Sequence, residues 1–281
     1  MKYLSMAEQL LFSTTLISGI NDNDEQVNFG TAFFLQYPIG SKKLIFAVTN
    51  RHIVENTHGA KKVFSTFTKS SQLQGGDPLI GETVSLDIAM NKEEWEFHSD
   101  NAIDVAVSLA WDLSKIDGSG TPLFMRSVGI DRIPSTQQLE ELDAIEEIVF
   151  VGYPNGEVDK TDRLPLFRKG ITASPLYKNI DKKPIFLIDA NIVPGSSGSP
   201  VFLYNNGQYA DKKGNLFAAR SRLFLLGILG GSYPRDIIEK PVDSYKIALF
   251  NANIGKVFKT ETIIDTIKSY LTRHNVETDS I

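Results

Sequence analysis

Residues 194–200 have the sequence PGSSGSP and are the strongest fold signal in the chain. They form a tight loop between two apolar segments, residues 185–190 and 201–204, which have the length and composition of β-strands. Glycines close to Ser197 on both sides allow backbone conformations that other residues avoid. A glycine- and serine-rich loop between prolines is by itself most often an ordinary turn. Its chemical meaning therefore depends on what the rest of the chain supplies.

Two earlier segments carry the residues that a serine hydroxyl needs for reactivity. Residues 48–54, VTNRHIV, put His52 at the end of an apolar strand, and residues 103–107, IDVAV, put Asp104 at the start of another. A serine hydroxyl is a weak nucleophile and needs a base, and histidine, with an unperturbed pKa of about 6.5, suits that role. A carboxylate on the other ring nitrogen fixes the tautomer of the histidine. We therefore predict Ser197 as nucleophile, His52 as base and Asp104 as the residue that orients the base.

The composition excludes several kinds of protein. The 281 residues are 42% apolar and 22% charged, which is ordinary for a globular protein. The formal net charge is −5 and no basic stripe is visible, so we expect no nucleic-acid partner. The chain has no cysteine, which excludes disulfides, thiolate nucleophiles and thiolate zinc sites, and which fits a reducing compartment. We expect no metal ion and no cofactor.

The chain carries no apparent signal for export or for membrane insertion. Glu8 and Gln9 precede the first apolar run, which is a poor match to a secretory signal peptide. The longest strongly apolar stretch, residues 223–231, is far too short to span a membrane. We therefore expect a soluble cytoplasmic protein with no membrane partner.

Short strands separated by turn residues dominate the predicted secondary structure. We expect strands at residues 10–20, 27–36, 44–49, 83–90, 105–109, 147–153, 185–190, 201–204 and 222–229. Many short strands at this spacing favour a sandwich or a barrel over βαβ units. The prediction is therefore an all-β protein.

Two segments have helical patterns instead. Ser135 and Gln138 have the spacing of a capping box, which predicts a short helix within residues 134–145. Residues 260–274 have their isoleucines and a leucine on one helical face, which predicts a C-terminal helix that packs on the body of the protein.

Several segments together resemble the trypsin/chymotrypsin-like serine peptidase superfamily. They are residues 30–34 (GTAFF), 48–52 (VTNRH), 103–107 (IDVAV) and 194–200 (PGSSGSP). The resemblance is closest to disulfide-free bacterial members, including the Deg/HtrA proteases, which residues 152–156 (GYPNG) and 189–192 (DANI) also match.

The resemblance implies two six-stranded antiparallel β-barrels with the active site in the cleft between them. Residues 1–112 would form the N-terminal barrel, which carries the histidine and the aspartate. Residues 113–146 would form a linker with the short helix. Residues 147–281 would form the C-terminal barrel, which carries the serine, followed by the C-terminal helix.

The implied function is a serine endopeptidase that cleaves a protein or peptide substrate through an acyl-enzyme. The backbone N–H groups of Gly195 and Ser197 would bind the oxyanion. A catalytically inactive trypsin-like binding module is the alternative, although such modules usually lose a member of the triad and none is lost here. Two features depart from the Deg/HtrA pattern: Ser199 replaces a common second glycine, and no PDZ-like segment follows. A regulatory protein partner is left open.

An esterase of the α/β-hydrolase type is a second alternative. That fold needs the pattern G-x-S-x-G, a helix after the serine and the histidine last in the chain. Here Ser199 occupies the final glycine position, a predicted strand follows the serine, and His52 comes first. The sequence therefore favours the peptidase.

The resemblance also implies a primary pocket formed by the stretch before the nucleophile and by a later strand. Its residues would be Asn191 at the floor, Ile192 and Val193 beside it, and Ile228, Leu229 and Gly230 on the opposite wall. None of these residues is charged, so the pocket offers no partner to a substrate arginine or lysine. We expect an uncharged side chain directly before the cleaved bond.

Asp87 is a rival to Asp104, because it also opens an apolar segment. We prefer Asp104, since residues 105–107 form a cleaner buried strand. Asp104→Asn is expected to lower kcat by on the order of 10⁴, as loss of the orienting carboxylate does in the Ser-His-Asp template. Asp87→Asn is the matched control and should change kcat little. Turnover of a peptide substrate measures both variants, and a larger loss in Asp87→Asn would transfer the role to Asp87.

Overall fold

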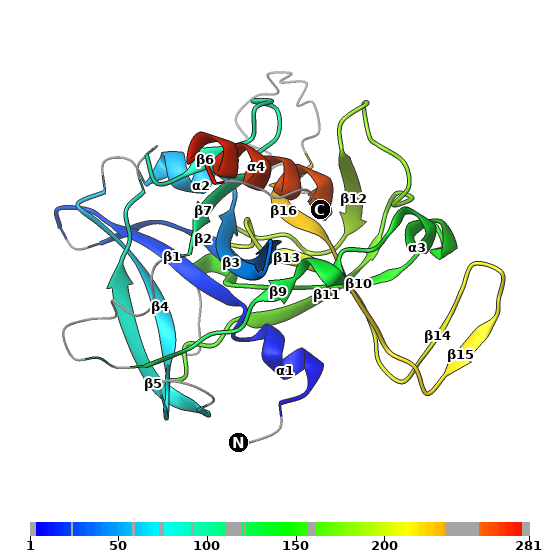
Figure 1. Cartoon of the computed structure of the whole chain (residues 1–281), viewed down its shortest axis with the longest axis horizontal. Helices are drawn as coiled ribbons and strands as arrows, with labels where there is room; N and C mark the ends of the chain where they lie inside the picture. Colours follow the sequence, from blue (N-terminus) through cyan, green and yellow to red (C-terminus); the bar gives the residue numbers. More distant parts are fainter. Residues whose placement is uncertain are drawn as a thin grey trace, which may run out of the picture.

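The computed structural model describes residues 4–23, 25–57, 60–72, 76–90, 93–110, 120, 122–156, 161–233 and 253–276. Two β-sheets, one in each half of the chain, make up most of the structure, and a C-terminal helix lies against both (Figure 1). This arrangement confirms the all-β prediction and the C-terminal helix.

The N-terminal half forms one sheet of nine strands. The strands are β1 (Thr14–Ile20), β2 (Gln26–Ile39), β3 (Lys42–Thr49), β4 (Lys62–Ser70), β5 (Pro78–Asp87), β6 (Glu96–Phe97), β7 (Ala106–Leu109), β8 (Leu123–Phe124) and β9 (Val128–Gly129). Their order is β5-β4-β1-β2-β3-β7-β6, with β8 on β4 and β9 on β2.

This sheet differs from the six-stranded antiparallel barrel that we expected. The two-residue strands β8 and β9 come from the segment predicted as a linker, and β9 pairs with β2 in parallel. Beyond the part of β2 and β4 that pairs with β1, the backbone N–H and C=O groups of these strands are free to bind another extended segment, and β9 and β8 pair there. A strand of two residues is too short to show a periodic pattern, so β8 and β9 could not be predicted from the sequence.

The C-terminal half forms a closed barrel of six antiparallel strands, as predicted. Its strands are β10 (Glu147–Gly152), β11 (Leu166–Thr172), β12 (Ile185–Asp189), β13 (Pro200–Asn205), β16 (Arg222–Ser232) and β17 (Ile254–Lys259), in the order β10-β11-β12-β17-β16-β13. Alternate residues point into the barrel, where Ile148, Phe186, Val201 and Val257 belong to one buried cluster. The interior is therefore filled by side chains.

The α-helices before the barrel are short. α1 (Met6–Leu10), which has a capping box of Ser5 and Glu8, ends at the first residue of the strand predicted over residues 10–20, and the strand itself begins at Thr14. α2 (Arg51–Asn56) directly follows β3. α3 (Thr136–Glu141) has the predicted capping box of Ser135 and Gln138. Two 3₁₀ turns are also described, η2 (Ile130–Arg132) and η3 (Pro154–Gly156).

The C-terminal helix α4 (Thr260–Arg273) joins the two halves of the chain. It lies against β6 and β7 of the N-terminal sheet and against β16 and β17 of the barrel (Figure 1). Its buried face includes Ile263 and Ile267, while Ser269 and Arg273 contact the carboxylate of Glu96 at 2.7 and 2.9 Å. No helix in the described part of the chain combines the length and apolar character needed to cross a membrane.

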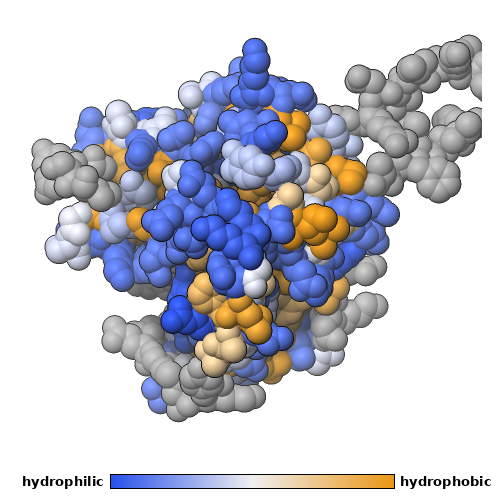
Figure 2. Space-filling model, turned by 90° about the vertical axis from the view of Figure 1, so that its right-hand side faces the viewer, coloured by the Kyte–Doolittle hydropathy of each residue, from blue (hydrophilic) through white to orange (hydrophobic). Residues whose placement is uncertain are grey.

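A hairpin of β14 (Gln208–Ala210) and β15 (Leu216–Ala218) projects from the barrel. Figure 2 shows the molecule from this side, where hydrophilic side chains predominate and apolar ones form separate patches. At the base of the hairpin, Arg222 packs over the Tyr209 ring at 4.1 Å and forms an ion pair of 3.2 Å with Glu146. Both charged side chains are less than one-tenth exposed. Burial raises the pKa of Glu146, while Arg222 acts in the opposite direction.

This buried pair predicts a large effect of a single substitution. Arg222→Met should lower the free energy of unfolding by about 3–5 kcal/mol, because it leaves the carboxylate of Glu146 buried without its cation. The control is Lys169→Met, which breaks the exposed 2.7 Å ion pair between Lys169 and Glu147, the residue that follows Glu146. This variant should lower the free energy of unfolding by at most about 1 kcal/mol. Urea unfolding of both variants measures the difference. Equal losses would show that burial does not govern the strength of these pairs.

Candidate active site

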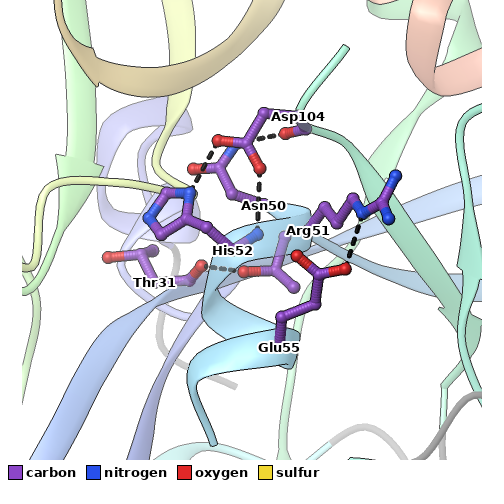
Figure 3. A network of polar contacts seen from close by, with 7 residues as sticks. Thr31, Asn50, Arg51, His52, Glu55 and Asp104 are labelled. Atoms are coloured by element: carbon purple, nitrogen blue, oxygen red, sulfur yellow. Dashed lines mark hydrogen bonds and ion pairs between the residues drawn. The ribbon is translucent and has the colours of Figure 1, made fainter. Parts of the chain in front are cut away.

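The sheet brings His52 and Asp104 together, although they are 52 residues apart in sequence. Strand β3 pairs with β7, with Val48 opposite Val107, so the residues that follow β3 lie beside those that precede β7. One oxygen of the Asp104 carboxylate accepts a hydrogen bond from Nδ1 of His52 at 2.6 Å, and the other accepts one from the backbone N–H of His52 at 2.9 Å (Figure 3). The carboxylate therefore fixes both the position and the orientation of the imidazole.

Neighbouring contacts hold the aspartate and the helix in place. The buried side chain of Asn50 donates to the backbone carbonyl of Asp104 at 2.7 Å (Figure 3). Arg51 binds Glu55 at 2.8 Å on the same helix. The side chain of His52 is 40% exposed and that of Asp104 is 22% exposed. With Nδ1–H held by the carboxylate, Nε2 of His52 is the ring atom left to accept a proton.

Asp87, the rival candidate, lies elsewhere. It ends β5 with a side chain that is 67% exposed, and it pairs with Lys62 at 2.7 Å. The apolar segment that Asp87 opens thus starts at an exposed strand end. The structure therefore puts Asp104, and not Asp87, next to His52.

Thr31, in β2, holds the serine loop against the N-terminal sheet. Its backbone N–H donates to the carbonyl of Ser197 at 2.9 Å, and its hydroxyl donates to the carbonyl of Gly195 at 3.0 Å. Its own carbonyl accepts from the hydroxyl of Thr49 at 2.7 Å. A Cβ at Gly198, where φ is +87°, would collide with the carbonyl oxygen of Thr31. The loop thus requires glycine at this position for its close approach and for its backbone conformation.

The hydrogen bonds of the loop also orient two backbone N–H groups. The carbonyl of the peptide unit before Gly195 accepts from the N–H of Asn155 at 2.5 Å, and that of the unit before Ser197 accepts from the N–H of Ser199 at 3.2 Å. Because a trans peptide is planar, the N–H at the other side of each unit points the opposite way. Neither N–H has an acceptor among the described residues.

Ser197 and His52 flank the same junction between the halves. Ser197 binds Thr31 through its carbonyl, and Thr31 binds Thr49, three residues before His52. The structure contains no direct hydrogen bond between the described side chains of Ser197 and His52. In enzymes without a bound substrate this contact is often longer than a hydrogen bond.

The predicted pocket residues separate into two groups. Ile192 and Leu229 belong to the cluster inside the barrel, whereas Ile228 belongs to the cluster between the barrel, the N-terminal sheet and α4. Successive residues of a strand point to opposite faces, so Ile228 and Leu229 cannot line one wall together with their side chains. Asn191 is exposed, and Val193 and Gly230 are partly buried.

Three contributors to this site were given no role from the sequence, although Thr31 and Asn155 lie in segments that carry the family resemblance. Thr31 and Asn155 orient the serine loop, and the guanidinium of Arg168 donates to the backbone carbonyl of Asn191 at 2.8 Å. A lone threonine beside Gly30 in an apolar strand is a signal for Thr31, but it is a weak one. No group of three or more His, Asp or Glu side chains in the described ranges is arranged to hold a metal ion.

The family model of the trypsin-like peptidase domain matches residues 30–209, more than half of the 281 residues. The chain belongs to the trypsin-like peptidase family. The matched region of this trypsin-like peptidase includes His52, Asp104 and Ser197. Membership supports a protease activity in general. The closer resemblance to Deg/HtrA proteases stays a prediction.

Solved protease structures are similar to this trypsin-like peptidase over most of its length. HL collagenase is 12% identical, with 96% of each chain covered and a TM-score of 0.48. The active form of the Rv3671c protease from M. tuberculosis is 16% identical, with 92% of this chain and 81% of that chain covered and a TM-score of 0.44. Its inactive form is 14% identical, with 98% and 91% covered and a TM-score of 0.43. No curated protein matches the sequence significantly.

The contacts of Thr31 predict separate effects on catalysis and on stability. Thr31→Val removes the hydroxyl that binds the Gly195 carbonyl and that accepts from the N–H of Tyr153 at 3.1 Å. The free energy of unfolding should fall by about 1–3 kcal/mol, because buried polar groups lose their partner. The kcat for peptide hydrolysis should fall as well, because the serine loop is no longer held.

Thr15→Val is the matched control. Thr15 lies opposite Ala32 in the neighbouring strand, is fully buried, and donates to the carbonyl of Thr66 at 3.1 Å. This variant should lose stability to a similar degree while keeping its kcat. An unchanged kcat in Thr31→Val would contradict the role of Thr31 in positioning the loop.

Proposed function

We propose that the protein is a serine endopeptidase in which Ser197 attacks the scissile carbonyl, His52 takes the serine proton, and Asp104 orients His52. The observation that carries the proposal is the pair of hydrogen bonds from His52 to the Asp104 carboxylate, at 2.6 and 2.9 Å. This pairing leaves Nε2 of His52 as the base and stabilises the imidazolium that forms when it takes a proton.

The backbone N–H groups of Gly195 and Ser197 are the proposed oxyanion hole. As the serine oxygen bonds to the carbonyl carbon, negative charge develops on the carbonyl oxygen. Two N–H donors whose orientations are already fixed cost no reorganisation at that moment. The bonds from Asn155 and Ser199 to the two preceding carbonyls support such a fixed orientation.

The proposed reaction proceeds in two stages. In the first, the Ser197 oxygen bonds to the substrate carbon, His52 passes the serine proton to the leaving amine, and the peptide C–N bond breaks. In the second, His52 takes a proton from a water molecule, whose oxygen attacks the acyl-enzyme, and then returns the proton to Ser197. The products are a carboxylate and an amine, and the enzyme is regenerated.

We further propose an uncharged side chain directly before the cleaved bond. The residues predicted to form the primary pocket, which are Asn191, Ile192, Val193, Ile228, Leu229 and Gly230, carry no charge. A substrate arginine or lysine would therefore lose hydration without gaining a charged partner among them. A cytoplasmic location is proposed from the cysteine-free composition alone.

Ser197→Ala should abolish both peptide hydrolysis and labelling by a fluorophosphonate, because the oxygen that forms the covalent bond is gone. Thermal unfolding should change little, since the side chain is only partly buried. The matched control is Ser196→Ala, whose hydroxyl is buried and has no hydrogen-bond partner among the described residues. That variant should keep labelling and turnover.

The same measurement separates the proposal from an inactive binding module. A module of this kind would bind peptides without reacting with a fluorophosphonate, even in its wild-type form. Labelling that persists in Ser197→Ala would contradict the choice of nucleophile. Wild-type protein that is neither labelled nor active on a peptide library would contradict the endopeptidase itself.

A further inference from the structure

One edge of β16 next to the serine loop carries no strand in the described part of the chain. Pairing with β13 ends where Ile228 lies opposite Pro200, and Leu229 then exchanges hydrogen bonds with the serine loop at 2.8 and 2.9 Å. On the other side, β17 still pairs with Ser232. A Cβ on Gly231 would lie 3.6 Å from the hydroxyl oxygen of Ser197. An extended peptide can therefore pair with residues 230–232 while its carbonyl lies at the serine.

The direction of such a peptide follows from the proposed mechanism. His52 gives its proton to the leaving amine, and it belongs to α2 of the N-terminal half. Residues 230–232 belong to the barrel, on the other side of the serine. The part of the substrate before the cleaved bond is therefore the part that runs along β16.

Lys256 lies beside this edge. It belongs to β17, and its Cε would be 3.4 Å from a Cβ on Gly230. The ammonium lies 4.9 Å from the centre of the Phe258 ring. Because Gly230 and Gly231 have no side chains, nothing from these two residues covers the lysine stem.

The ammonium of Lys256 has no oxygen of a described residue within hydrogen-bond or ion-pair distance, although the side chain is partly buried. Burial lowers the pKa of Lys256, Asp104 raises it, and Lys183 lowers it further. Asp104 gives its carboxylate to His52. By contrast, Lys259 on the same strand donates to Asn179 at 2.7 Å. The ring of Phe258 neutralises no charge, so a partly desolvated ammonium without an oxygen partner among the described residues is costly, and a ligand carboxylate removes that cost.

We propose that Lys256 binds the side-chain carboxylate of a substrate glutamate or aspartate located two to four residues before the cleaved bond. The peptidase would then select an uncharged residue at the bond and an acidic residue upstream of it. Lys183 adds positive charge to the same region. This inference rests on the proposed endopeptidase function.

The test uses pairs of fluorogenic peptides that differ only by glutamate or glutamine at the second, third or fourth position before the bond. At one of these positions, wild-type kcat/KM should be about tenfold higher with glutamate, a ratio expected for one charge-assisted hydrogen bond. The ratio should fall to about one in Lys256→Met, because the apolar stem remains and the charge is lost. It should be retained in Lys256→Arg and in the matched control Lys259→Gln.

The outcomes distinguish the inference from the function on which it rests. Hydrolysis of both peptides of every pair at equal rates by the wild-type protein would overturn this inference and leave the endopeptidase intact. A preference for glutamate that survives in Lys256→Met would also overturn it. Absence of hydrolysis together with absence of fluorophosphonate labelling would overturn the endopeptidase, and this inference with it.

Discussion

The hydrogen bonds of Thr31 link the two halves of the chain at the point where the proposed chemistry occurs. The backbone N–H of Thr31 binds the carbonyl of Ser197, its hydroxyl binds that of Gly195, and its carbonyl accepts from Thr49, close to His52. The serine loop belongs to the barrel, whereas the histidine and the aspartate belong to the N-terminal sheet. Neither half holds the complete set of residues, so the relative position of the halves decides whether the set can react.

Apolar packing stabilises that relative position, and the hydrogen bonds specify it. Phe33 of the N-terminal sheet, Phe202 and Phe258 of the barrel and Tyr270 of α4 belong to one buried cluster. Each fully buried side chain of this size contributes about 1.5–3 kcal/mol, compared with about 0.5–1.5 kcal/mol net for a hydrogen bond. Packing therefore supplies most of the stability of the interface. Hydrogen bonds are directional, so the few that cross the interface determine how the serine loop is oriented.

Two charged groups near the site have different partners: Asp104 pairs with His52 within the protein, and Lys256 is proposed to pair with a carboxylate of the substrate. The carboxylate of Asp104 is satisfied by His52, and Lys256 stays beyond ion-pair distance of it. A closer lysine would compete with the imidazole for the carboxylate and would oppose the charge that His52 acquires during the reaction. At its observed place, Lys256 leaves the pair of Asp104 and His52 intact, and its ammonium can bind the proposed substrate carboxylate. Catalysis and the proposed selection of acidic substrates can thus coexist within a few residues of each other.

The sequence by itself determined the all-β class, the capped helix after Ser135 and the C-terminal helix, because each follows from periodicity or from spacing within a few residues. It also gave His52 and the loop of Ser197, whose residue types are chemically distinctive. The closed C-terminal barrel was expected from the family resemblance, since the strand pattern alone fits a sandwich as well as a barrel. Only the tertiary structure decided that the N-terminal sheet has nine strands and that Asp104 rather than Asp87 lies beside His52. Only the tertiary structure shows that Thr31 contacts the serine loop at Gly195, 164 residues away in the sequence. Contacts between distant residues depend on how strands pair, and a polar residue in a strand has the same local sequence whether it faces solvent or a catalytic loop.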